Sequence, residues 1–257
     1  MGAVIGGIYA AGKLKEYEEW VCAITRLDIL KFMDLSWGID GLVKGDKIIN
    51  TLVELVGDKT IEELPIKFTA VAADISNDKE VWINSGSLFK AIRASISLPL
   101  FLTPVPYKNS FLVDGGVLNP VPIAPTFYDD VDMTIAVDLS GPSYLDEDFS
   151  DSEPSLIQKE ISGSKLEALQ KKIESFMSFL GKDNSNNQKA SQRVFDIAAQ
   201  AFDSMQNTIA RHKLAAYPPD HLIEIPRDAC RTMEFHRAAE LIAMGQQAAK
   251  KFLHSQE

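Results

Sequence analysis

The stretch FLVDGGVLNPVP places a carboxylate, Asp114, directly before two glycines. The apolar residues ahead of it predict a strand, so the carboxylate lies where that strand ends. Open α/β sheets present their reacting groups at such strand ends. Gly115 and Gly116 lack a Cβ, so the chain can turn sharply and another group can approach the carboxylate closely. Asp-Gly-Gly alone is also a common turn, and these residues by themselves leave a structural role open.

Other polar residues are weaker candidates for chemistry. Asp74 and Asp138 also end predicted strands, but neither has flanking glycines, and we expect both to cap the loops that follow. Arg93 could stabilise charge near the site or hold the loop after its helix, and the structural role is favoured. His236 is predicted on a helix surface. Ser143 lies in GPSYL, which lacks the final glycine of Gly-x-Ser-x-Gly and is better explained as a surface turn.

Composition excludes several classes of function. The 257 residues carry a net charge of -10, which argues against nucleic-acid binding because phosphates require basic patches. Cys22 and Cys230 lack metal-ligand spacing and are expected to be reduced thiols of a cytoplasmic protein. The four histidines form no metal motif. We therefore predict no metal, no cofactor and no nucleic-acid partner.

Hydrophobic patterning predicts strands that alternate with helices, and hence a layered α/β fold. We expect Asp46 to cap one helix and Ser87 another. A linker is predicted over 181–188. One domain over 1–257 is expected, with a core over 1–140, an acidic loop, helix and linker over 141–190, and C-terminal helices with a short strand over 191–257. The predicted strands cover 66–74, 79–84, 110–114, 132–139 and 221–226, and the predicted helices cover 2–12, 15–35, 46–56, 87–95, 165–180, 194–209 and 234–253.

The first residues, MGAVIGGIYAAGKL, are small and apolar and have no preceding side chain that could cap a helix. The segment is too short to span a bilayer, and no basic region precedes it as in a secretory signal. The glycine spacing predicts a helix that packs closely against a sheet or another helix. The segment alone does not indicate which structural element precedes this helix in the chain.

The order and spacing of AIRASISLP, DGG, NPVP and DMTIAVDL resemble the patatin-like phospholipase family, specifically its bacterial members. The opening GAVIGGIYAAGK is similar to the helix that follows the Gly-x-Ser-x-Gly nucleophile turn of that family. HLIEIP and AAELIAMGQQAA resemble its final strand and helix. The resemblance implies a three-layer α/β/α fold with a central, mainly parallel sheet that lacks its N-terminal strands. It also implies hydrolysis of acyl esters in lipids.

The resemblance further implies a Ser-Asp dyad in which Asp114 is the base. Met1 and Gly2 would be the last two residues of the nucleophile turn, and the serine would immediately precede Met1. Met1, Gly2, Gly115 and Gly116 would form the turns and the oxyanion site. Since loss of a nucleophile costs roughly a million-fold in turnover, the chain as given is expected to be inactive.

Two explanations of the missing serine remain open at this point. An N-terminal truncation just after the serine is favoured, and a natural relative without a nucleophile is the other. The alternative function is a non-catalytic lipid-binding or scaffolding protein of the same fold. The expected partners are a lipid or acyl-ester substrate and, transiently, a membrane surface. The protein is expected to be cytoplasmic and to bind the membrane only peripherally.

Overall fold

The computed structural model of the chain describes residues 1–32, 43–99, 101–127, 129–142, 185–230 and 234–254. Contacts divide the chain into two compact units, Met1–Tyr144 with Gln206–Glu257, and Leu145–Met205. The described part of the second unit is helical and belongs to α7, Ser185–Ala216. The helix predicted over 165–180 and the candidate Ser143 lie outside the described residues. A single domain over 1–257 stays a prediction.

The helices of the first unit lie in the predicted segments, except that the segment predicted as helical over 15–35 is divided into α2 and α3 by residues 23–25. Ser87 caps α5 as expected, since its hydroxyl accepts a hydrogen bond from the Lys90 N–H. The prediction that Asp46 caps a helix is wrong, because Gly45 takes the cap position with a φ of 75° and Asp46 is the first helical residue. Part of the predicted linker is helical, since α7 begins at residue 185. The other helices are α1 (Gly2–Ala10), α2 (Leu14–Cys22), α3 (Arg26–Phe32), α4 (Asp46–Val56), α5 (Leu88–Ser95) and α8 (Ala238–His254).

The strands form two sheets among the described residues. Four of them pair in the order β2-β1-β4-β3, and β5 pairs with β6. Every pair in the first sheet is antiparallel, whereas β5 and β6 are parallel. The strands are β1 (Ala70–Asp74), β2 (Lys79–Ile83), β3 (Val105–Tyr107), β4 (Ser110–Asp114), β5 (Ile135–Gly141) and β6 (His221–Pro226).

The fold is α/β, as predicted, but the expected mainly parallel sheet is not what the described strands form. Short turns join β1 to β2 and β3 to β4, and Asp78 and Lys108 in these turns each have a φ of 50°. A connection of a few residues can only join antiparallel neighbours, because a parallel pair needs a long crossover. The turns therefore decide the strand direction.

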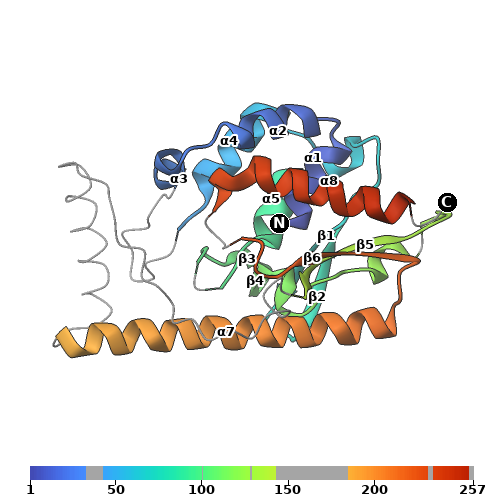
Figure 1. Cartoon of the computed structure of the whole chain (residues 1–257). Helices are drawn as coiled ribbons and strands as arrows, with labels where there is room; N and C mark the ends of the chain where they lie inside the picture. The colour runs from blue at the N-terminus through green and yellow to red at the C-terminus, as the bar shows by residue number, and fades with distance from the viewer. Residues whose placement is uncertain (33–42, 100, 128, 143–184, 231–233, 255–257) are drawn as a thin grey trace. The chain divides into compact units, whose positions relative to one another are not determined.

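Helices cover the strands of the first unit on two sides, consistent with three α/β/α layers. Figure 1 shows α1, α2, α4 and α8 on one side of the strands. The C-terminal turns of α7 contribute Ala210 and Leu214, which pack with Ala136 of β5 and with Val121 and Ile123 in the segment before it. Among the described residues, no helix is both long and apolar enough to cross a membrane.

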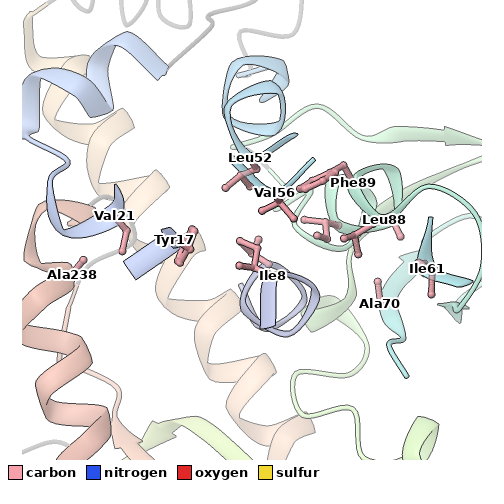
Figure 2. Close-up of a cluster of buried hydrophobic side chains, with 13 residues drawn as sticks. Ile8, Tyr17, Val21, Leu52, Val56, Ile61, Ala70, Leu88, Phe89 and Ala238 are labelled. Carbon is pink, nitrogen blue, oxygen red and sulfur yellow. The ribbon is translucent and has the colours of Figure 1, made fainter. Parts of the chain in front are cut away.

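The main hydrophobic core fixes the position of α1. Ile8 is fully buried and lies at the centre of a cluster with side chains of α2, α4 and α5 (Figure 2). Gly7 explains how closely α1 approaches α5, since a Cβ there would lie 2.9 Å from Ile92 Cδ1 and 3.0 Å from Leu88 Cδ1. The helix does pack closely, but at Gly7 and not through the spacing of Gly2 and Gly6 that predicted it, since a Cβ on Gly2 would meet no atom within 4 Å and one on Gly6 only the Phe68 ring at 3.7 Å. This packing holds the beginning of α1 in a defined place.

Candidate active site

The carboxylate of Asp114 is held at the end of β4, where the strand pairs with β1. The Asp114 backbone N–H donates to the Ser97 carbonyl at 2.9 Å. Its Oδ1 accepts a hydrogen bond of 2.7 Å from the Gly116 N–H and so caps the short helix η2, Gly115–Val117. The strand, the Ser97 contact and the cap together leave the side chain one defined position.

Close contacts require the glycine at 115, where a side chain would meet backbone, and restrict position 116, where it would meet two side chains. A Cβ on Gly115 would lie 2.2 Å from the Val71 carbonyl oxygen, a distance that real atoms do not reach. A Cβ on Gly116 would lie 3.0 Å from Asp114 Oδ1 and 2.8 Å from Gln206 Nε2. The turn can therefore approach β1 only because Gly115 lacks a side chain, and the absence of one at Gly116 leaves room beside the carboxylate.

A cavity of about 410 Å³ brings the end of β4 together with the beginning of α1, although these segments are far apart in the sequence. Every site residue predicted from the sequence contributes to its wall. A carboxylate and a helix N-terminus therefore face the same space. The lining residues used below are Met1, Gly2, Asp114, Gly115, Gly116 and Asn119.

The environment of Asp114 makes its carboxylate more basic. Burial raises its pKa above the ordinary range, and the N-terminal ammonium group and the Gly116 N–H offset part of this effect. A general base works best when its pKa approaches the working pH, so burial moves this carboxylate in the useful direction. The same burial disfavours the charged form in the folded protein.

This burial predicts a pH-dependent gain in stability for Asp114→Asn. Because the folded-state pKa is raised, the stabilisation by the bound proton is fully present below the unfolded pKa of about 3.9 and is lost as the pH rises through the folded pKa. Asparagine carries no charge and can still accept from the Gly116 N–H. The variant should therefore have the higher free energy of unfolding at about pH 7.

The measurement for this prediction is urea unfolding of both proteins between about pH 3 and pH 7. The difference in the free energy of unfolding should shrink as the pH falls toward the ordinary aspartate range. A parent protein that is the more stable of the two at neutral pH would show that other groups compensate the partly buried charge of Asp114.

The two rival aspartates have structural roles, as predicted. Asp74 is buried and accepts hydrogen bonds from Ser110 Oγ at 2.6 Å and from the Ser76 N–H at 3.2 Å. The Ser110 contact holds its pKa below the ordinary range. Asp138 accepts from both the N–H and the hydroxyl of Ser140, at 2.9 Å and 2.6 Å. Asp74 thus fixes the loop after β1, as predicted, whereas Asp138 lies inside β5 rather than at its end, and its contacts with Ser140 stay within that strand, where the pairing with β6 is irregular.

Arg93 also has the structural role that the sequence favours. Its Nη1 donates to Ser97 Oγ at 2.6 Å, and its Nε and Nη2 donate to the Lys44 carbonyl at 3.0 Å and 2.5 Å. The guanidinium therefore ties the loop after α5 to the residues before α4, and Ser97 in turn carries the carbonyl that accepts from Asp114. His236 lies in the short helix η5 (Phe235–Arg237), where its Nε2 accepts from Arg26 Nε at 3.2 Å.

Sequence reasoning missed a buried polar group at the site, Asn119. It follows the Asp-Gly-Gly turn in the quoted NPVP stretch, so its position was visible, but its burial of all but 3% was not. The partner of its amide is Glu80, which also pairs with Lys213 at 2.6 Å. No local pattern links these three positions. The described residues also contain no cluster of histidine, cysteine or acidic side chains that could hold a metal ion.

The chain is thus an α/β protein with a carboxylate at the end of a strand, the place where open α/β sheets commonly present their reacting groups. The model of the patatin-like phospholipase family matches residues 1–127. An "uncharacterized NTE family protein" of Mycobacterium bovis is 33% identical over 297 residues, which cover 100% of this chain and 82% of that protein. An "uncharacterized NTE family protein" of Mycobacterium tuberculosis has the same identity and the same coverage of both chains.

A third relative has an activity in its name. Lysophospholipase NTE1 of Lodderomyces elongisporus is 28% identical over 131 residues, which cover 48% of this chain and 9% of that protein. Taken together, the matches show that the chain belongs to the patatin-like phospholipase family, as the resemblance indicates. Its family is one of lipid hydrolases.

Proposed function

We propose that the chain forms the acyl-ester hydrolase site of a lipid hydrolase, with Asp114 as the general base. The observation that carries this proposal is the shared cavity of Asp114 and the beginning of α1. A serine hydroxyl presented at that end of α1 would face the carboxylate. The family relationship supports a lipid ester as the substrate.

The mechanism follows from the positions of these groups. Asp114 accepts the proton of the serine hydroxyl while the serine oxygen attacks the ester carbonyl, and it returns this proton to the oxygen of the departing alcohol as the acyl-enzyme forms. Water then attacks the acyl-enzyme, and the same carboxylate accepts the proton of the water and passes it to the serine oxygen as the acid is released. The first amides of a helix have no partner within the helix, so those of α1 at Gly2 and Ala3 can stabilise the oxyanion.

The nucleophile itself is not among the 257 residues, which contain no Gly-x-Ser-x-Gly. Within the proposal, the serine belongs immediately before Met1, where the resemblance aligns it. The cytoplasmic location and transient contact with a membrane surface remain predictions.

Labelling by a serine-directed fluorophosphonate tests the proposed function. The chain as given should not react, whereas a chain extended so that Gly-x-Ser directly precedes Met1 should be labelled and should hydrolyse a short-chain ester. The control is the extended chain with that serine replaced by alanine. A folded extended chain that binds short-chain esters but neither reacts nor turns over would favour the alternative, a non-catalytic lipid-binding protein.

A further inference from the structure

One face of α1 lines the cavity along the length of the helix. Residues at spacings of three and four form this face, and all but one have no side chain larger than a methyl group: Gly2, Ala3, Gly6, Tyr9 and Ala10. Residues at these spacings lie on the same side of a helix. Val4 and Ile8 on the other side are buried in the main core, so the core holds the small residues toward the cavity.

The segment that leads into β1 forms a second wall of the same cavity. At one end of this wall, Val71 lies beside the Asp-Gly-Gly turn, since its carbonyl oxygen is the atom that a Cβ on Gly115 would meet. Phe68 lies beside Gly6, where a Cβ would be 3.7 Å from its ring. Ile66 lines the cavity further from the turn and is 44% exposed. The wall therefore leads away from the carboxylate past two large apolar side chains.

The beginning of α1 lies at the carboxylate end of the cavity. Burial raises the pKa of Asp114, and the N-terminal ammonium group opposes this effect, which requires the two charged groups to be near each other. From Gly2 to Ala10 the helix extends about 12 Å, at about 1.5 Å per residue. An extended hydrocarbon chain advances by about 1.3 Å per carbon, so this length corresponds to about nine carbons.

The part of the cavity from Gly6 onward is suited to hydrocarbon. It is termed the apolar arm, and it is lined by Gly6, Tyr9, Ala10, Ile66 and Phe68. Lys67 also lines the cavity, but its ammonium group pairs at 2.8 Å with Asp129, which does not. In the proposed function the ester carbonyl lies beside Asp114, and the acyl chain attached to it carries no polar group. The acyl chain is therefore the part of the ester that gains most from leaving water for the apolar arm.

We propose that the apolar arm binds the acyl chain of the ester, that it accommodates about nine carbons, and that Gly6 determines this length by leaving the arm open. The proposal rests on the proposed function and names its substrate class, esters of medium-chain acids. A Cβ at position 6 would already touch the Phe68 ring, so the rest of a leucine side chain would lie in the arm. It would close the arm about 6 Å from Gly2, at about the fifth carbon.

Binding to the chain as given tests this inference without any turnover. The probes are monoacylglycerols whose acyl group lengthens from butanoyl through hexanoyl, octanoyl and decanoyl to dodecanoyl, each used below its micellar concentration. Titration calorimetry should show an affinity that rises about threefold for each added methylene as far as monodecanoyl glycerol. Monododecanoyl glycerol should gain no more than about twofold over monodecanoyl glycerol, since its last carbons lie outside the arm.

Gly6→Leu should end this rise at monohexanoyl glycerol and leave the affinity for monobutanoyl glycerol as in the parent protein. Gly245→Leu is the matched control, because Gly245 is also a helical glycine, does not line the cavity, and has no atom within 4 Å of the position of a Cβ. It should keep the parent dependence on acyl length.

A second variant tests the far end of the apolar arm without changing α1. Ile66 is 44% exposed, so the fold can tolerate a polar side chain there. Ile66→Asn should reduce only the gain from monooctanoyl to monodecanoyl glycerol. Ile75→Asn is its control, since Ile75 is 51% exposed and does not line the cavity.

The outcomes separate the two proposals. An affinity of the parent protein that does not depend on acyl length would overturn the apolar arm. The parent dependence on length in Gly6→Leu, or in Ile66→Asn if Gly6→Leu does not fold, would overturn it as well. A rise that continues unchanged to monododecanoyl glycerol would overturn the length limit. Failure of every ester to bind would instead count against the acyl-ester site, and with it everything that rests on that site.

Discussion

Asp114→Asn should lower turnover of a short-chain ester about ten-thousandfold in the chain extended with the serine, as loss of a general base does in comparable enzymes. The reason is chemical, because asparagine cannot accept the proton of the attacking hydroxyl. The geometry should survive, since the amide oxygen can still accept from the Gly116 N–H that Asp114 binds at 2.7 Å. The measurement is kcat together with the unfolding transition of both proteins.

Asp138→Asn is the matched control for this prediction. Asp138 also follows a run of strand residues and accepts two hydrogen bonds, both from Ser140, but it does not line the cavity. Its replacement should leave most of the turnover intact. If Asp114→Asn kept more than about a tenth of the parent kcat, another group would have to be the base.

Gly115→Ala should cost the protein much of its stability, about 3 kcal/mol or more. The added Cβ would lie 2.2 Å from the Val71 carbonyl oxygen and 2.8 Å from the Val71 carbonyl carbon. Both atoms belong to the backbone of β1, so relief requires the two central strands to separate. The free energy of unfolding from urea titration measures this effect.

Gly245→Ala provides the contrast within the same chain. Gly245 lies inside α8, and a Cβ there would meet no atom within 4 Å. Alanine should leave the stability unchanged or raise it by up to about 1 kcal/mol, since it is the better helix former. Equal effects of the two substitutions would contradict the backbone clash at Gly115.

The gain in stability expected of Asp114→Asn and its loss of activity have the same origin. The carboxylate is partly buried beside the cavity, which raises its pKa and its strength as a base. That burial also penalises the charged form at neutral pH. A protein selected for stability alone would have no reason to keep an aspartate here.

The sequence by itself determined the local features of this protein. Ser87 caps its helix, the apolar runs before Asp74 and Asp114 are strands, and the glycines after Asp114 make the turn, since each depends on neighbours within a few residues. The family relationship follows from such local patterns in their order. Local patterns are ambiguous where two neighbouring residues could each cap a helix. At the start of α4 the N-cap is Gly45 and not Asp46, the residue that the sequence predicted.

Only the tertiary structure decided which groups meet. Packing of α1 against α5 through Gly7 brings Gly2 to the same cavity as Asp114, and nothing in either segment specifies the other. The contact of Glu80 with Lys213, on which the orientation of Asn119 depends, joins residues of β2 and α7. The sequence specifies the chemical type of each side chain. Burial and the distances between side chains arise only when the hydrophobic core forms. They determine that the pKa of Asp114 is raised and that the Asn119 Oδ1 has no donor among the described residues.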